Sequence, residues 1–269
     1  MTSGSHETTE PRHEATMGSP FDLFSLEGKV ALVTGGSRGL GRQMSLAFAR
    51  AGADVIVTSR KLEACEEVVA EITSTTGRRG LAYGCHLGRW DEIEGLVDTA
   101  YDRFGRVDVL VNNAGMSPVY DKVTDVTERM YDSVLNLNLK GPFRLTQLVG
   151  TRMKEQGSGS IINVSSTGSL RPMGSIIPYA AAKNGLNAMT EGFADLLGPE
   201  VRVNTLMPGQ YLTDVAAAWD MEHTNKMAAR LHLERVGNPP EIIGAALFLA
   251  SAASSYTSGT IVRSDGGIP

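Results

Sequence analysis

Short apolar runs alternate with segments of helical periodicity from Lys29 almost to the C-terminus. Runs such as KVALVTGG, DVIVTSR and VDVLVNNAG are typical of strands buried on both faces, because most of their residues are apolar. Between them, LGRQMSLAFARAG and LEACEEVVAEI place apolar residues three and four positions apart, as a helix with one buried face requires. Strands that alternate with helices predict an α/β fold. With right-handed crossovers, residues 25–269 are predicted to form one Rossmann-type domain, whose doubly wound parallel sheet of about seven strands carries helices on both faces.

The composition narrows the function classes. Charged side chains make up 20% of the 269 residues and the net charge is −5, which argues against nucleic-acid binding. No apolar run approaches the roughly 20 residues that a membrane-spanning helix needs. The two cysteines, Cys65 and Cys85, have the spacing of neither a disulfide framework nor a metal site. We therefore expect a soluble protein of a reducing compartment, most simply the cytoplasm, with no metal, membrane or nucleic-acid partner.

The N-terminal segment differs from the rest of the chain. MTSGSHETTEPRHEATMGSP is polar and nearly free of aliphatic side chains, so residues 1–24 are predicted to form a disordered tail. This stretch lacks the apolar core of a signal peptide. His6 and His13 are interpreted as solvated tail residues, and the apolar FDLF at 21–24 could dock back on the domain.

The glycine-rich stretch TGGSRGLG, residues 34–41, joins the first apolar run to the first helical segment. Gly35, Gly39 and Gly41 would let the backbone turn sharply and approach a pyrophosphate, which would rest on the N-terminus of the helix. Three glycines also occur in purely structural turns, so the motif alone is weak evidence. Here a strand precedes it and a helix follows, which is the context that dinucleotide binding requires.

Tyr179 and Lys183 are four residues apart, so they lie on one face of a predicted helix. A serine pair, Ser165 and Ser166, stands before them at the end of a predicted strand. Reduction of a ketone needs a hydride at carbon and a proton at oxygen, and a phenol can donate that proton. The ordinary pKa of a phenol is about 10, and a neighbouring ammonium favours the phenolate and lowers this pKa. The pattern favours proton transfer to a carbonyl; the alternative is a surface Tyr–Lys pair whose ammonium lies in solvent.

The chain resembles the short-chain dehydrogenase/reductase family over nearly its whole length from about Leu26. The motifs that carry the resemblance are the G-x-x-x-G-x-G spacing of the glycine loop, NNAG at 112–115, NLKG from Asn138, the serine followed by Tyr-x-x-x-Lys, and PGQYLT at 208–213. This resemblance implies an oxidoreductase that transfers a hydride between NADP(H) and a carbonyl compound or secondary alcohol.

The resemblance also implies the catalytic residues, which are Asn138, Ser166, Tyr179 and Lys183. Ser166 lies thirteen residues before Tyr179, which is the family spacing, and would bind the carbonyl oxygen. Lys183 would in addition hold the nicotinamide ribose. Asn138 would hold a water that relays protons to the lysine, and a buried asparagine at a helix kink is compatible with that role. The residues that would bind the cofactor are Gly35, Ser37, Arg38, Gly39, Leu40, Gly41, Ser59, Arg60, His86, Leu87, Asn112, Ala114, Gly115, Tyr179, Lys183, Pro208, Gly209 and Thr213.

The end of the second predicted strand decides between the two nicotinamide cofactors. An NAD enzyme places a carboxylate there, on the ribose 2′-hydroxyl, but this chain has Ser59 followed by Arg60, with Arg38 in the glycine loop. A hydroxyl and two guanidinium groups suit a 2′-phosphate, which predicts NADPH and net carbonyl reduction. The alternative is two solvated surface arginines. His86 stands where the family usually has an aspartate near adenine, as in some NADPH-dependent carbonyl reductases; it could accept a hydrogen bond from adenine, or it could be a packed or surface histidine while the Leu87 backbone makes that contact.

The substrate is expected to be a mid-sized, largely apolar carbonyl compound. Residues expected to frame its pocket are Met116, Ser117, Pro118, Thr167, Arg171, Met173, Tyr211 and Trp219. Three alternatives stay open: a 3-oxoacyl thioester reductase, a sugar or alcohol dehydrogenase, and a non-catalytic NADP(H)-binding regulatory protein. The helix IIGAALFLASAAS is apolar on most sides and, with the last strand, predicts a subunit interface and a symmetric homotetramer.

Overall fold

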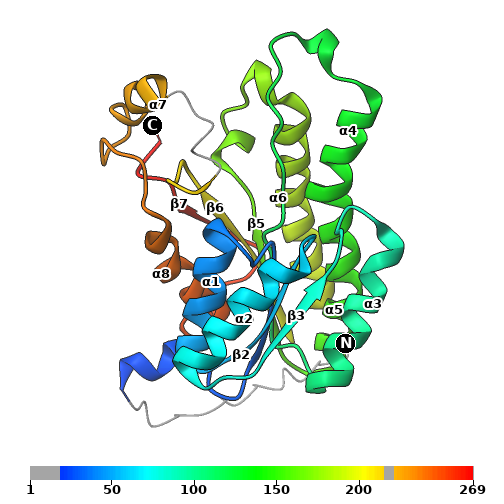
Figure 1. Cartoon of the computed structure of the whole chain (residues 1–269). Coiled ribbons are helices and arrows are strands. Elements are labelled where there is room, and N and C mark those ends of the chain that lie inside the picture. The colour runs from blue at the N-terminus through cyan, green and yellow to red at the C-terminus, as the bar shows by residue number, and fades with distance from the viewer. Residues whose placement is uncertain (1–18, 215–220, 269) are drawn as a thin grey trace, which may run out of the picture.

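The computed structural model describes residues 19–214 and 221–268 (Figure 1). In this part of the chain, seven strands form one sheet in the order β3-β2-β1-β4-β5-β6-β7, and every neighbouring pair is parallel. The predicted Rossmann-type sheet is confirmed. The strands are β1 (Val30–Thr34), β2 (Asp54–Ser59), β3 (Gly80–Gly84), β4 (Val109–Asn112), β5 (Gly159–Val164), β6 (Val201–Pro208) and β7 (Ile261–Ser264).

Helices cover both faces of the sheet (Figure 1). One face carries α1 (Gly39–Arg50), α2 (Leu62–Thr76) and α8 (Ile243–Ala250), and the other carries α3 (Trp90–Phe104), α5 (Gly141–Gln156) and α6 (Ile177–Leu197). Towards the end of the molecule where the strands finish lie α4 (Glu128–Leu135) and α7 (Met221–Ala228). The short helical turns are η1 (Pro20–Phe24), η2 (Val123–Asp125), η4 (Thr167–Ser169), η5 (Gly174–Ile176), η7 (Pro239–Ile242) and η8 (Ala252–Ser254), together with the π turn η3 (Asn136–Lys140).

The apolar strand sequences are explained by this double cover. Along β1, Ala31 and Val33 point into the core beneath α1, α2 and α8, whereas Leu32 points into the core beneath α3, α5 and α6. Successive side chains of a strand alternate between the faces, so a strand with helices on both sides must be apolar at every position. All three residues are fully buried.

The region between Thr127 and Gln156 is a continuous run of helical turns. Its helical repeat changes at the π turn η3, which lies between α4 and α5. Pro142 lies in the first turn of α5, where a missing N–H is tolerated. The π turn matters for the site because it contains Asn138.

The N-terminal part of the described chain is η1, which packs near η8. Residues 21–24 are all exposed, and Phe21 keeps 83% of its surface exposed, so the apolar FDLF side chains are not buried against the domain. The prediction of a disordered tail falls largely on residues 1–18, which lie outside the described residues. Within residues 19–214 and 221–268, no helix combines the length and the apolar character needed to cross a membrane.

Candidate active site

The glycine loop follows β1 at the edge of the sheet where all the parallel strands end. Gly35 has a φ of 61°, a conformation that other residues rarely adopt. The first turn of α1 comes so close that a Cβ on Gly41 would lie 2.2 Å from the carbonyl oxygen of Gly35. The loop therefore presents backbone and almost no side chain at the N-terminus of α1, which suits the close approach of a phosphate group.

Asn113 fixes this loop to β4. Its side-chain amide donates to the carbonyl oxygens of Thr34, at 2.8 Å, and of Gly35, at 3.3 Å. The Thr34 hydroxyl in turn accepts hydrogen bonds from the backbone N–H groups of Asn113 and Ala114. The sequence patterns did not point to Asn113, because NNAG contains two adjacent asparagines and only the strand direction decides which of them faces the loop.

Asn112, by contrast, points into the interior. It was expected to bind the cofactor, but its side chain is only 2% exposed and donates to Thr146 Oγ1 and to Asn163 Oδ1. This expectation was wrong for the side chain, because β4 is covered on both faces and residue 112 still belongs to the strand. Gly115, three residues later, is exposed at the edge of the sheet.

Four polar residues lie at the ends of β1 and β2, namely Ser37, Arg38, Ser59 and Arg60. The Ser37 hydroxyl donates to Ser59 Oγ at 3.0 Å, and the Ser59 hydroxyl donates to the carbonyl oxygen of Lys61 at 3.1 Å. Both Arg38 and Arg60 are exposed, and neither forms an ion pair with any residue in 19–214 or 221–268. Two guanidinium groups thus remain available beside a pair of hydroxyls, with no carboxylate at the end of β2.

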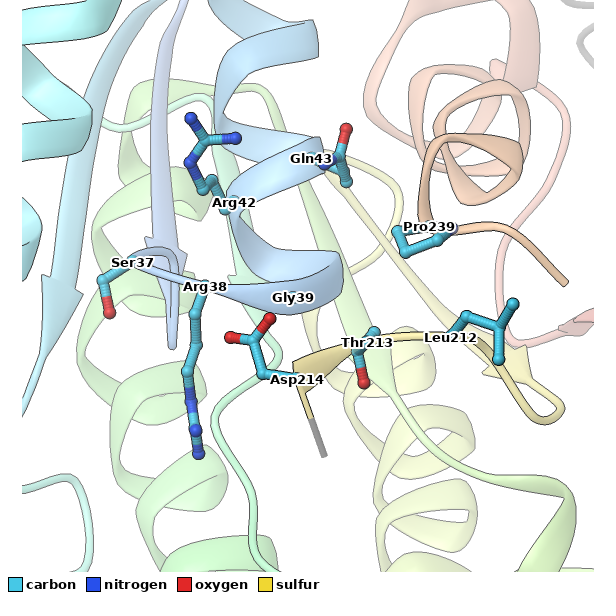
Figure 2. A pocket seen from close by; sticks show the side chains of 9 residues that line it. All are labelled: Ser37, Arg38, Gly39, Arg42, Gln43, Leu212, Thr213, Asp214 and Pro239. Carbon is cyan, nitrogen blue, oxygen red and sulfur yellow. The ribbon is translucent and has the colours of Figure 1, made fainter. Parts of the chain in front are cut away.

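A polar pocket opens beside the glycine loop (Figure 2). The segment after β6 forms the opposite wall, so Arg38 and Gly39 face Thr213 although they are far apart in the sequence. In Figure 2 the Arg38 side chain extends into the open space beside Asp214. The pocket is lined by Ser37, Arg38, Gly39, Arg42, Gln43, Leu212, Thr213, Asp214 and Pro239.

His86 and Leu87 follow β3. The Leu87 side chain belongs to the core and is 4% exposed. The backbone N–H of His86 donates to a carboxylate oxygen of Glu92, and its ring Nδ1 accepts from the N–H of Gly88 at 3.2 Å. Because Nδ1 is the acceptor, a neutral His86 ring carries its proton on Nε2. The side chain is then a donor at Nε2, so it does not offer the acceptor of the first alternative, in which His86 accepts a hydrogen bond from adenine.

Ser166, Tyr179 and Lys183 come together at the end of β5 and the start of α6. The Ser166 side chain lies beside the Tyr179 phenol and lowers its pKa, and its oxygen accepts a hydrogen bond from the N–H of Gly168 at 3.1 Å. The Lys183 side chain is 4% exposed; its Nζ donates to the carbonyl oxygen of Val164 at 2.7 Å and lies 5.8 Å from the centre of the Tyr179 ring. The ammonium of the Tyr–Lys pair is therefore buried and does not lie in solvent.

The two serines of the pair have different environments. Ser165 is 3% exposed and donates to the carbonyl oxygen of Lys183, so it joins β5 to α6. Ser166 is half-buried; its oxygen accepts from the N–H of Gly168, and its hydroxyl lies beside the Tyr179 phenol. Of the two serines it is the partly exposed one, which makes it the candidate for a contact with a substrate oxygen.

Asn138 lies behind the lysine and is fully buried. Its side-chain amide donates to the carbonyl oxygens of Val134 and Met116, each at 2.9 Å, so it holds the segment after β4 against the π turn. A Cβ on Gly115 would lie 2.6 Å from Asn138 Oδ1 and 3.5 Å from Lys183 Nζ, which shows that Gly115 stands beside both groups.

Burial sets the protonation behaviour of the pair. It raises the pKa of Tyr179, and the hydrogen bond with Ser166 opposes this rise. Burial also lowers the pKa of Lys183 to about 8. In the protein alone, desolvation thus outweighs the lowering of the tyrosine pKa by the lysine that the sequence suggested.

The burial of Lys183 predicts a trade-off between stability and activity. The pKa falls from 10.5 to about 8, so holding the ammonium in the fold opposes stability by about 3 kcal/mol. Between pH 8 and about pH 10.5 the unfolded chain binds more protons than the folded protein. The stability cost of the buried ammonium is therefore complete below pH 8 and disappears as the pH rises to about 10.5. Lys183→Met should therefore raise Tm at pH 7 by about 5 °C, less so at pH 10, and should abolish turnover. Calorimetry at both pH values tests this, with the exposed Lys61→Met as control; a lower Tm at pH 7 would contradict it.

The segment after β6 carries the last group of expected residues. Pro208 ends the strand, and the N–H of Gly209 donates to the carbonyl oxygen of Ser264 at 3.0 Å. Tyr211 was expected in the substrate pocket, but it is 6% exposed within the core, and its hydroxyl lies 2.6 Å from Ser264 Oγ. That expectation was wrong, because the chain turns inward after Gly209. Trp219 lies outside the described residues.

The comparisons with known proteins identify the family of the chain. A family model described as short chain dehydrogenase matches residues 29–224. The chain belongs to the short-chain dehydrogenase family. Members of this family transfer hydride between a nicotinamide cofactor and a carbonyl or alcohol, so the protein is an oxidoreductase.

Three short-chain dehydrogenases illustrate the range of its relatives. The 3-oxoacyl-[acyl-carrier-protein] reductase FabG of Thermotoga maritima is 37% identical, and the match covers 90% of this chain and 98% of that protein. The structure of an NADPH-dependent 3-quinuclidinone reductase from Rhodotorula rubra is similar with a TM-score of 0.89 at 29% identity, covering 98% of both chains. A 7α-hydroxysteroid dehydrogenase complexed with NADH has a TM-score of 0.86 at 34% identity, covering 91% of this chain and 96% of that one.

Proposed function

We propose that this protein is an NADPH-dependent reductase of mid-sized, largely apolar carbonyl compounds. The observation that carries the proposal is the contact of the Tyr179 phenol with Ser166, beside a buried Lys183. Ser166 donates a hydrogen bond to the carbonyl oxygen of the substrate and stabilises the negative charge that develops there. Tyr179 donates the proton to the same oxygen. Lys183 holds the nicotinamide ribose and favours the phenolate that remains.

Asn138 supports the proton supply through its main chain. Its side-chain amide is already used by Val134 and Met116, so the water that passes protons towards Lys183 would bind its carbonyl oxygen. The residue four positions later is Pro142, which has no N–H, so the ordinary helical hydrogen bond to that carbonyl cannot form. The π turn thus lacks the ordinary helical hydrogen bond at this carbonyl, which supports its proposed contact with a water.

The residues present fit NADP(H). When bound, the cofactor supplies the hydride for reduction or accepts it in oxidation. The glycine loop leaves room for the pyrophosphate, and Ser37, Arg38, Ser59 and Arg60 supply hydroxyls and unpaired guanidinium groups at the end of β2 for a 2′-phosphate. The 3-quinuclidinone reductase is described as NADPH-dependent, while the hydroxysteroid dehydrogenase holds NADH, so the choice rests on these four residues.

The apolar character of the substrate is inferred from exposed side chains on the segments that adjoin the site. Leu170 and Met173 lie between Ser166 and Tyr179 in the chain, and both are nearly half exposed. Val119 follows Gly115 on the segment after β4, and Leu212 follows Gly209 on the segment after β6. It is the grouping of these large apolar side chains on segments that adjoin the site which favours an apolar ligand.

A panel of ketones run with NADPH and with NADH tests the function, with the absorbance of the reduced nicotinamide as readout. We expect 1-phenyl-1,2-propanedione and 3-quinuclidinone to be reduced with NADPH faster than 5-keto-D-gluconate. The second candidate function, a 3-oxoacyl thioester reductase, is favoured by the Thermotoga maritima relative, and acetoacetyl-CoA in the panel tests it. Absence of turnover with every compound and both cofactors would favour the non-catalytic regulatory protein.

Ser166→Ala should lower kcat about 10²-fold, because it removes the donor to the developing oxyanion. Ser165→Ala is the matched comparison. It removes a buried hydrogen bond to the Lys183 carbonyl, so we expect it to lower the free energy of unfolding by about 1 kcal/mol and to change kcat less than tenfold. Steady-state kinetics and urea unfolding of both variants separate the roles. If Ser165→Ala were the more damaging variant for kcat, the assignment of Ser166 would be wrong.

Two apolar surfaces support the proposal of a homotetramer. The strand β7 is an edge of the sheet with partly exposed residues, and the neighbouring α8 leaves Leu247 and Phe248 only half-buried. A second apolar hollow is lined by Leu135, Leu139, Phe143 and Met189 on α4, η3, α5 and α6. Two separate surfaces are what a tetramer built as a dimer of dimers requires. Sedimentation velocity measures the number of subunits in the assembly.

A cytoplasmic location remains a prediction from the composition.

A further inference from the structure

The chain that follows β5 is joined to α6 by several buried polar contacts. Lys183 Nζ donates to the carbonyl oxygen of Val164, and the Ser165 hydroxyl donates to the carbonyl oxygen of Lys183. One turn further along the helix, the side-chain amide of Asn187 donates to Ser169 Oγ at 3.1 Å. The Ser169 hydroxyl in turn donates to the carbonyl oxygen of Ser166 at 2.7 Å. The last two bonds form a chain from α6 to the peptide group of Ser166.

The two side chains that form these hydrogen bonds are buried. Ser169 is 5% exposed and Asn187 is 7% exposed. Ser169 Oγ accepts from Asn187, so its single proton is directed to the Ser166 carbonyl, which also accepts from the Ser169 backbone N–H at 2.9 Å. The peptide group after Ser166 is therefore held by two donors, and its orientation determines where the Ser166 side chain points.

The hydrogen bonding of the Asn187 side chain opposes folding. Its Oδ1 is buried without a hydrogen-bond partner among the described residues. A buried polar atom that has lost water and gained no partner opposes folding, and a leucine has nearly the same shape without that cost. An asparagine at this position is therefore better explained by the hydrogen bond that its Nδ2 donates to Ser169 than by stability.

We propose that Asn187 and Ser169 are positioning residues that hold the Ser166 hydroxyl against the Tyr179 phenol. Tyr179, Lys183 and Asn187 follow one another at intervals of four residues on α6, so they form one row along a single rigid helix. Fixing the Ser166 peptide to this row fixes the serine hydroxyl relative to the phenol on the same helix. The inference rests on the proposed role of Ser166 in carbonyl reduction.

The test compares Asn187→Leu and Ser169→Ala with Asn184→Leu, which changes an exposed asparagine of the same helix. The measurements are kcat for the fastest-reduced ketone of the panel, Kd for NADPH, and Tm. We expect kcat to fall about tenfold in Ser169→Ala and about fivefold in Asn187→Leu, because a small displacement of a catalytic group has a large effect on the rate. We expect Kd for NADPH to stay within about twofold, Asn184→Leu to behave as wild type, and Tm of Asn187→Leu to equal or exceed that of wild type.

A double-mutant cycle separates positioning from a merely structural role. If the two residues act through Ser166, then adding Asn187→Leu or Ser169→Ala to Ser166→Ala should reduce kcat by less than about twofold further. The proposal would be overturned if Asn187→Leu or Ser169→Ala reduced kcat as much in the Ser166→Ala background as in the wild-type protein. Wild-type kcat in both single variants would also overturn it. Should Ser166→Ala itself retain wild-type kcat, the role of Ser166 in the proposed function would fail; should it be impaired while both single variants are normal, only the positioning role would fail.

Discussion

Tyr179→Phe should lower kcat for carbonyl reduction by about 10³-fold or more, while Kd for NADPH changes less than about twofold. The substitution removes one oxygen atom, which is the proton donor, and leaves the ring that faces Lys183 in place. Burial raises the pKa of Tyr179 in the protein alone, so the phenol is protonated and able to act as an acid throughout the neutral range. Stopped-flow measurement of NADPH oxidation and fluorescence titration of NADPH binding give the two constants.

Tyr256→Phe is the matched control, because Tyr256 is fully exposed and its hydroxyl lies far along the chain from the site. We expect it to leave kcat unchanged. A Tyr179→Phe variant within a few-fold of wild type would exclude the phenol as the proton donor. It would leave the fold and the family unaffected, because these rest on the sheet and on the family match.

Wild-type protein should prefer NADPH over NADH by on the order of 10²-fold in kcat/KM, and Ser59→Asp combined with Arg60→Ala should reverse the preference. The new carboxylate would repel a 2′-phosphate and would accept a hydrogen bond from the free 2′-hydroxyl of NADH. Ser37 is placed to support it, since its hydroxyl already donates to residue 59. The measurement is kcat/KM for both cofactors at one fixed ionic strength, because charged contacts weaken with salt.

Arg50→Ala is the control for this experiment. Arg50 is an exposed arginine at the C-terminal end of α1, at the opposite end of the helix from the glycine loop, so its loss should not change the cofactor ratio. Equal use of NADH and NADPH by the wild-type protein would refute the role of Arg38 and Arg60. The assignments of Tyr179 and Lys183 would stand, because they serve the nicotinamide end of the cofactor.

The parts of the molecule that follow from regular periodicity could be predicted from the sequence. The seven strands were recognisable because a strand covered on both faces is mostly apolar, as β1 shows. The pairing of Tyr179 with Lys183 followed from the helical repeat, which places residues four apart on one face. Burial of the lysine did not follow, because it depends on how α6 meets β5.

The residues that were missed or misplaced lie where regular structure ends. The assignment of Asn112 rather than Asn113 to the cofactor side failed because the last residue of β4 still points into the core. Tyr211 was misplaced because the turn after β6 directs it inward against Ser264. The contact of Asn187 with Ser169 joins two segments whose approach is a tertiary event. No local pattern encodes such contacts.

The row of residues on α6 also limits where the chain can change in length. Inserting or deleting one residue between Tyr179 and Lys183 would rotate them apart by about 100°, so this stretch of the helix tolerates no change of length. The stretch from Thr167 to Ile176 is different, since it consists of short turns with exposed side chains such as Leu170 and Met173. The exposed side chains of this stretch can vary without moving Ser169 or the helix that follows, so the range of substrates accepted can diverge while the proton chemistry is retained.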